Sequence, residues 1–259
     1  MHGDRFRVAA EKFGDHEGMS PGHVLRWACQ FDDEDLSVAV RLLERVSYYN
    51  TTNIRAFTRQ LIQIAELELP IDRYPAVAIV PVGGPGSGSQ VVSRAVREAV
   101  KGTRFRLIGM LDLTSAARGE YSAVLFLDDF GGTGDTLRRW WENVEALVRP
   151  LDAEVVFGLL VLNQRARSVL EEIASRVLCT LELDDAANVF DDASRDFDPQ
   201  QREVLMKYAA RTGCAAKYLR GYGNCGLIVS FRHGCPNNSI PTLWHETGAW
   251  RALFSRKAV

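Results

Sequence analysis

An acidic pair followed by a loop rich in glycine and threonine is the part of the sequence best suited to chemistry. Asp128 and Asp129 follow four apolar residues, 124–127, which are typical of a buried strand. The loop 130–136 reads FGGTGDT, and a helical pattern starts at Leu137. Ligands of open α/β sheets bind where strands end, and the backbone N–H groups of such a loop hold phosphate at a helix N-terminus. The two carboxylates suit sugar hydroxyls or a Mg²⁺ ion.

A second loop, VPVGGPGSGS at 80–89, lies between an expected strand and an expected helix. Its first and last glycines have the spacing of a P-loop, but that motif needs a Lys directly after the last glycine, where Ser89 stands. The glycine spacing of a dinucleotide-binding loop is also absent. The segment is therefore either a plain turn or a phosphate loop of another kind. Its candidate ligand-binding residues are Gly83, Gly84, Pro85, Gly86, Ser87 and Gly88.

The elements that must position these loops alternate along the middle of the chain. Apolar runs predict strands at 76–81, 105–113, 123–127, 154–162 and 178–183. Helical spacing between them predicts helices at 91–100, 137–148 and 168–175. Because the strands are largely apolar, we expect a parallel sheet that is covered by helices on both faces.

The two ends of the chain lack the alternation of strands and helices that is expected in its middle. Residues 1–19 are polar and are expected to form a loose tail, after which Ser20 caps a helical module reaching to about residue 69. Residues 184–198 contain six aspartates and predict a solvated acidic loop, and Asp198 caps a helix at 200–211. The remaining tail is rich in aromatic and turn residues and is expected to pack back on the core.

Composition excludes several classes of protein. The chain has 259 residues, 46% of them hydrophobic and 25% charged, with a net charge of −2, which excludes a disordered or collagen-like chain. There is no overall basic excess, and Asp32 to Asp35 repel phosphate, so direct nucleic-acid binding is not expected, although a local basic patch is compatible with these numbers. Without a secretory signal, a membrane-length apolar run or a CxxC pair, we expect a cytoplasmic protein with reduced thiols and no membrane contact.

The segment 124–136 resembles the phosphoribosyl pyrophosphate (PRPP) motif of type I phosphoribosyltransferases: four hydrophobic residues, two acids, and a loop ending T-G-x-T. The resemblance implies that Asp128 and Asp129 are the catalytic acid pair, meeting the ribose hydroxyls and serving as candidate ligands of Mg²⁺. It implies a 5′-phosphate loop made of Phe130, Gly131, Gly132, Thr133, Gly134, Asp135 and Thr136. It also implies that the loop 83–88 holds pyrophosphate.

The sequence departs from that family at two places. Its members carry a long flexible loop before the acid-pair strand, whereas only 114–121 separates the two strands here, with Arg118 as its single basic residue. The purine-specific members place a carboxylate base at the position of Gly132. Phosphoribosyl binding is therefore better supported than phosphoribosyl transfer. Three alternatives stay open: an enzyme that transfers or cleaves a phosphoribosyl group, a non-catalytic PRPP or nucleotide sensor, and a structural subunit.

The flanking segments resemble phosphoribosyltransferase-like domains of bacterial conflict (anti-phage defence) systems. The resemblance is carried by Trp27, Gln30, Phe31, Asp32 and Asp35 near the start, by Cys235 to Trp244, and by Trp250 to Arg256 near the end. It implies a PRPP- or nucleotide-recognising component of a multi-gene defence system that has a protein partner.

These observations predict an α/β fold with a parallel-sheet, type I phosphoribosyltransferase-like core, an N-terminal helical extension and a C-terminal hood. The expected division is a tail and helical module at 1–70, the α/β core at 71–183, and a C-terminal extension packed on the core at 184–259. The expected ligand is PRPP or a related nucleotide, with Mg²⁺ as cofactor.

Overall fold

The structure is a computed structural model, and it describes residues 3–69, 77–84 and 87–254. The chain forms two compact units. We call residues 52–183 the sheet unit, and residues 1–51 together with 184–258 the terminal unit. This division differs from the expected one, because the two ends of the chain share one unit and the helix that precedes residue 70 belongs with the sheet.

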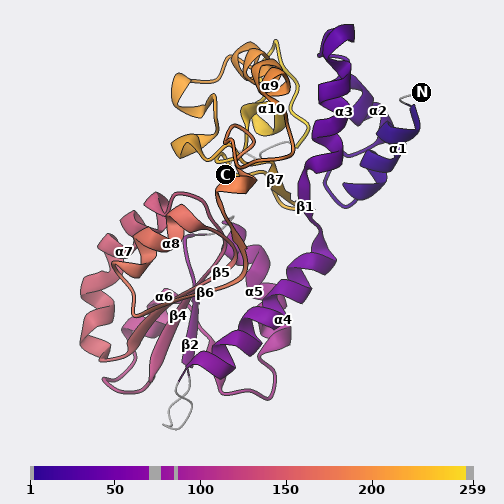
Figure 1. Ribbon diagram of the computed structural model, residues 1–259. Helices are drawn as coiled ribbons and strands as arrows, with labels where there is room; N and C mark the ends of the chain where they lie inside the picture. Colours follow the sequence, from indigo (N-terminus) through magenta and orange to yellow (C-terminus); the bar gives the residue numbers. More distant parts are fainter. Residues whose placement is uncertain (1–2, 70–76, 85–86, 255–259) are drawn as a thin grey trace. The chain divides into compact units, whose positions relative to one another are not determined.

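The sheet unit contains a five-stranded parallel sheet with the order β3-β2-β4-β5-β6 (Figure 1). Its strands are β2 (Val77–Pro81), β3 (Phe105–Leu107), β4 (Ala123–Gly131), β5 (Glu154–Asn163) and β6 (Arg176–Leu183). The chain leaves β2 for β3 on one side and returns to β4 on the other. The strand order therefore reverses between β2 and β4, which is where ligands bind in open α/β sheets.

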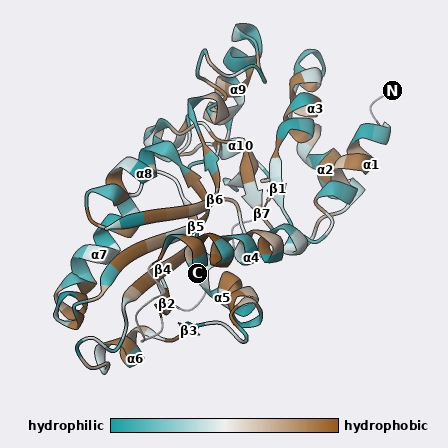
Figure 2. Ribbon diagram, turned by 60° about the horizontal axis from the view of Figure 1, so that its bottom comes forward, coloured by the Kyte–Doolittle hydropathy of each residue, from teal (hydrophilic) through white to brown (hydrophobic). Residues whose placement is uncertain are grey.

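Helices cover both faces of this sheet, as the apolar strands predicted. They are α4 (Thr51–Glu68), α5 (Gly88–Ala99), α6 (Met110–Thr114), α7 (Asp135–Val148) and α8 (Gln164–Glu171). One face is packed by α6, α7 and α8 through a cluster that includes Leu113, Trp141 and Leu170. On the other face, Leu61 of α4 approaches Gly158 of β5. Figure 2 shows the hydrophobic strands running between the two helical layers.

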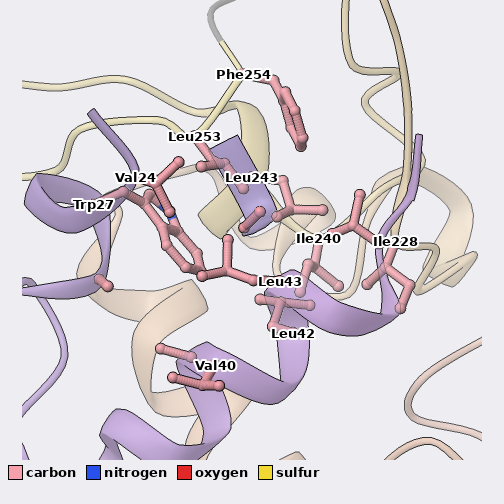
Figure 3. Packing of buried hydrophobic residues seen from close by; sticks show 14 of the residues in the cluster. Val24, Trp27, Val40, Leu42, Leu43, Ile228, Ile240, Leu243, Leu253 and Phe254 are labelled. Carbon is pink, nitrogen blue, oxygen red and sulfur yellow. The ribbon is translucent and has the colours of Figure 1, made fainter. Parts of the chain in front are cut away.

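The terminal unit is mainly helical. It contains α1 (Gly3–Lys12), α2 (Pro21–Ala28), α3 (Leu36–Arg45), α9 (Pro199–Arg211) and α10 (Pro241–Trp244), with short 3-10 turns between them. Strands β1 (Ser47–Tyr49) and β7 (Val229–Phe231) form a parallel pair. Residues from both ends of the chain meet in one core, where Trp27 and Leu43 pack with Ile240, Leu243 and Phe254 (Figure 3).

Two sequence expectations were wrong. The segment expected as a loose tail at 1–19 contains α1 in its described part, from residue 3, and Phe6, Ala9 and Ala10 of this helix are buried. The expected strand at 105–113 ends at Leu107, and the rest of that apolar run forms α6, because a short apolar run does not distinguish a strand from a buried helix.

The expected helix starts are confirmed. The hydroxyl of Ser20 accepts a hydrogen bond from the His23 backbone at 3.1 Å. Asp198 and Gln201 form a reciprocal capping box at the start of α9. In the part of the chain that the structure describes, no helix is long and apolar enough to cross a membrane.

Candidate functional site

The acidic pair lies at the carboxyl end of β4, the central strand of the sheet. Asp128 and Asp129 belong to the strand itself, which the structure extends to Gly131 beyond the expected end at Leu127. The Asp129 backbone N–H donates a hydrogen bond of 2.9 Å to the Asp128 carboxylate. The pair is therefore held on regular strand backbone, which orients it more rigidly than a loop would.

The electrostatics of this pair are unfavourable in the ligand-free protein. Burial and the negative charge of Asp129 raise the pKa of Asp128 well above its usual value. Among the described residues, none forms an ion pair with Asp128. A buried carboxylate beside a second negative charge is stabilised by a divalent cation or by hydroxyl donors. The residues present therefore fit a magnesium ion or a ribose.

The glycine-rich loop after β2 lies directly beside the acidic pair. The Val82 backbone N–H donates to the Leu127 carbonyl at 2.9 Å, which ties the start of the loop to β4. At the end of the loop, a Cβ added to Gly88 would collide with the carboxylate of Asp129. Only glycine lets the N-terminus of α5 approach the acidic pair this closely.

Two serines stabilise this loop from within. The Ser87 and Ser89 hydroxyls share a hydrogen bond of 2.8 Å, and Ser89 also donates to the Val82 carbonyl. Gly83 adopts a φ of 84°, a conformation that favours glycine. Ser89 was not among the predicted site residues; it is buried on the first turn of α5, and the only signal for it was its place after the last glycine of the loop. Pro85 and Gly86 lie outside the described residues.

The second predicted loop joins β4 to α7. Gly134 caps α7 with a φ of 85°, and a Cβ there would lie 2.8 Å from Val169 of α8. Gly131 is similarly tight against Leu162. Thr133 donates a hydrogen bond of 3.0 Å to Asp135, so this hydroxyl is held by a carboxylate at the helix N-terminus.

The remaining residues of this loop differ in exposure. Phe130 is partly buried and ends the strand with Gly131, whereas Gly132 is buried and Thr136 is exposed in the first turn of α7. The structure thus brings the described residues of both loops to the same end of neighbouring strands, because β2 pairs with β4.

The short segment 114–121, which stands where the resembled family has a long loop, makes its own contacts. It contains the end of α6 and the turn up to Tyr121, and its basic residue Arg118 forms an ion pair of 3.1 Å with Asp152. Arg118 is therefore engaged at the opposite end of β5 from its ligand-binding edge, since Asp152 precedes that strand.

The aromatic and amide residues of the C-terminal signature have structural roles. Trp244 and Trp250 are buried, and their indole N–H groups donate to backbone carbonyls of Ser239 and Thr242. Asn238 is buried and donates to the Tyr222 carbonyl at 3.1 Å. These residues belong to the core of the terminal unit.

The parallel sheet, its order reversal between β2 and β4, and the acidic pair with two glycine-rich loops at that point define a phosphoribosyltransferase-like α/β domain. The chain matches the family PRTase-CE over residues 24–256, and it belongs to this family. A comparison with curated proteins gave no match.

Several solved phosphoribosyltransferases are similar to part of the chain. Orotate phosphoribosyltransferase from Aeropyrum pernix is 15% identical, with 51% of this chain and 71% of that chain covered and a TM-score of 0.35. Xanthine-guanine-hypoxanthine phosphoribosyltransferase from Helicobacter pylori is 11% identical, with 53% and 89% covered and a TM-score of 0.35. Orotate phosphoribosyltransferase from Mycobacterium tuberculosis H37Rv is 18% identical, with 51% and 71% covered and a TM-score of 0.33. These likenesses carry no argument about substrate.

Proposed function

We propose that the sheet unit binds PRPP or a related nucleotide together with Mg²⁺. The observation that carries this proposal is the contact between Gly88 and the Asp129 carboxylate, which puts a glycine-rich helix N-terminus against an acidic pair. One ligand that carries both phosphates and sugar hydroxyls satisfies both groups at once. A helix N-terminus attracts anions, and carboxylates accept hydrogen bonds from hydroxyls.

Each part of the site has a separate task in this proposal. Asp128 and Asp129 hold the ribose hydroxyls and provide the oxygen ligands for Mg²⁺, which supplies positive charge to the pyrophosphate. Backbone N–H groups of 130–136 hold the 5′-phosphate, and those of 83–88 hold pyrophosphate. If a phosphoribosyl group is transferred or cleaved, the two carboxylates stabilise the positive charge that develops at the ribose carbon.

A non-catalytic sensor is the second candidate. It is favoured by Gly132, which offers no carboxylate base, and by the short segment 114–121, whose Arg118 is paired with Asp152. Release of pyrophosphate from PRPP, or of a free base from a nucleotide, separates the enzyme from the sensor. A protein that binds tightly and releases neither is the sensor.

The cellular setting is also a proposal. Membership of PRTase-CE and the resemblance of the flanking segments to domains of conflict systems support a cytoplasmic component of an anti-phage defence system with a protein partner. Loss of phage resistance on substitution of the acidic pair, within the intact gene neighbourhood, tests this role.

The binding experiment is a thermal shift with PRPP and Mg²⁺. A ligand at about 100 times its Kd adds about 2.7 kcal/mol, which raises the Tm of a chain of this size by roughly 5–10 °C. We expect this rise in the wild type and its loss in Asp128→Asn/Asp129→Asn. Asp33→Asn/Asp185→Asn is the matched control, because both aspartates are exposed and have no ion pair among the described residues. No rise in the wild type contradicts PRPP as the ligand.

A further inference from the structure

The outer face of α5 and the turn that follows it carry a concentration of positive charge. Between residues 94 and 106 the chain has five cations and one acid, Glu98. Arg94 and Arg97 are exposed on one side of α5, three residues apart, and Lys101 is exposed in the turn that follows the helix. Arg104 and Arg106 are exposed around the start of β3, an edge strand of the sheet.

The three cations on α5 and in the turn after it are unpaired in the described part of the chain. None of Arg94, Arg97 and Lys101 takes part in an ion pair or a side-chain hydrogen bond there. Other cations of the sheet unit do pair with acids, as in the ion pairs Arg167–Glu182 and Arg176–Glu154, both shorter than 3 Å. The charge on α5 is therefore available to a partner.

The opposite side of α5 limits what that partner is. Val92, Ala95 and Val96 are buried against the sheet, so the helix has little apolar surface left to insert into a lipid bilayer. The exposed residues of 94–106 include no aromatic side chain on which a base could stack, since Phe105 is buried. What remains is a polar, cationic strip suited to an extended polyanion.

We propose that this strip, from Arg94 to Arg106, binds the phosphate backbone of a nucleic acid without reading its sequence. Along the axis of α5, Arg94 and Arg97 are separated by about 4.5 Å, close to the roughly 3.4 Å per nucleotide of a duplex strand. Lys101 continues the strip in the turn after the helix. Arginine and lysine are the side chains that make backbone contacts in such complexes. The absence of exposed aromatic residues removes the stacking on which base-dependent binding of single strands relies.

The overall net charge of −2 does not oppose this proposal, because the charges are separated along the chain. The acidic residues Asp32 and Asp35 lie in the terminal unit and are already paired with Lys207. The proposal is independent of PRPP binding. The two sites share α5, however, since Arg94 lies six residues, or about 9 Å along the helix axis, beyond Gly88.

The test is fluorescence anisotropy with two labelled probes of mixed sequence, a 30-nucleotide single strand and a 30-base-pair duplex. We expect the wild type to bind both, and to lose about 20-fold in affinity for the single strand between 50 and 200 mM salt, as expected when about three phosphates are neutralised. Arg94→Glu/Arg97→Glu should weaken binding by at least about tenfold, and Arg94→Lys/Arg97→Lys should restore most of it, because the backbone contact depends on charge.

The matched control is Arg118→Glu/Arg149→Glu, which makes the same change in net charge at exposed arginines that are paired with Asp152 and Glu145. It should bind within about twofold of the wild type, and Asp128→Asn/Asp129→Asn should bind undiminished. Circular dichroism melts establish that each variant is folded. Equal losses in the test and control variants overturn the proposal, as does loss of binding in the acidic-pair variant. Wild-type binding to polyglutamate or anionic vesicles but to neither probe also overturns it.

Discussion

Two acidic pairs in this chain have opposite environments. Asp128 and Asp129 in the sheet unit sit at a strand end, and the pKa of Asp128 is raised well above its usual value by burial and by its neighbour. Asp32 and Asp35 in the terminal unit sit beside α9, and hydrogen bonds from Arg211 and Lys207 hold the pKa of Asp32 well below its usual value. Asp128 has no ion pair among the described residues, whereas Asp32 is paired with two cations.

The compensated pair is part of the fold. Lys207 contacts both carboxylates, at 2.9 Å from Asp32 and 2.7 Å from Asp35. The buried Tyr208 hydroxyl donates to Asp35 at 2.9 Å and accepts the Asp32 backbone N–H at 2.7 Å. Asp32, Glu34 and Asp35 are close enough together to hold a metal ion. The two aspartates, however, are already paired with Lys207 and Arg211. Such a network joins α9 to the segment before α3 and leaves little charge for a ligand.

The difference between the two pairs distinguishes charges that stabilise the fold from charges that a ligand can satisfy. Charges that are satisfied within the protein stabilise its structure, whereas charges that are left unsatisfied weaken the free protein and are satisfied when a ligand arrives. By this criterion the end of β4 suits a ligand better than the Asp32–Asp35 region does, in agreement with the proposed function. Three experiments test this contrast, in order of decreasing expected effect.

The largest effect is expected from Gly88→Ala. Its new Cβ would collide with the Asp129 carboxylate, so either α5 or the acidic pair must move, and the stabilisation by PRPP of about 2.7 kcal/mol at 100 times Kd should be lost. Gly248→Ala is the control outside both loops, because its Cβ meets nothing within 4 Å. A thermal shift with and without PRPP measures both. Equal PRPP-induced shifts in the two variants would show that the close approach of Gly88 to Asp129 is not needed for binding.

A smaller effect, on stability alone, is expected from Tyr208→Phe. The substitution removes a donor to the buried Asp35 and an acceptor for the Asp32 backbone, and leaving such groups unsatisfied costs about 1–3 kcal/mol. Urea denaturation should show this decrease in the free energy of unfolding, with the PRPP-induced shift unchanged. Tyr222→Phe is the control, because its hydroxyl forms no hydrogen bond with Asp32 or Asp35 among the described residues. A loss of PRPP binding in Tyr208→Phe would contradict the separation of roles.

The smallest expected effect is a change in Tm that has opposite signs in the two acidic pairs. Asp128→Asn should raise the Tm of the ligand-free protein by at least about 2 °C at neutral pH in the presence of EDTA, because it removes a carboxylate that burial and a like charge disfavour. Asp32→Asn should lower the Tm, because it removes the negative charge and one of the two oxygens to which Lys207 and Arg211 donate. Differential scanning calorimetry measures both changes.

Both changes should depend on pH. The folded-state pKa of Asp128 lies above its unfolded value, so the cost of its charge is absent at acidic pH and grows as the pH rises through the folded pKa. The pKa of Asp32 is lowered on folding, so its contribution is present above the unfolded pKa of about 4 and is lost as the pH falls. Tm differences that keep the same size at pH 3.5 and pH 8 would show that these charges are not the cause.

Local patterns in the sequence predicted much of the site. The order of apolar run, acids and glycine-rich loop identified β4, its acidic end and α7, because these features depend on neighbours in the chain. The same reasoning misread 105–113, where an apolar run too short to show its period became β3 followed by α6. It also missed α1, whose buried Phe6 and Ala10 pack against residues that are distant in the sequence.

The sequence by itself determined the alternation of strands and helices, the acidic pair and the two loops, because hydrophobic periodicity and glycine content are local properties. Only the tertiary structure decided that Gly88 meets Asp129, that the two ends of the chain share a core, and that Asp32 is neutralised while Asp128 is not. These contacts join residues about 40 to 240 positions apart. Strand order and packing set their distances, and burial sets their energies.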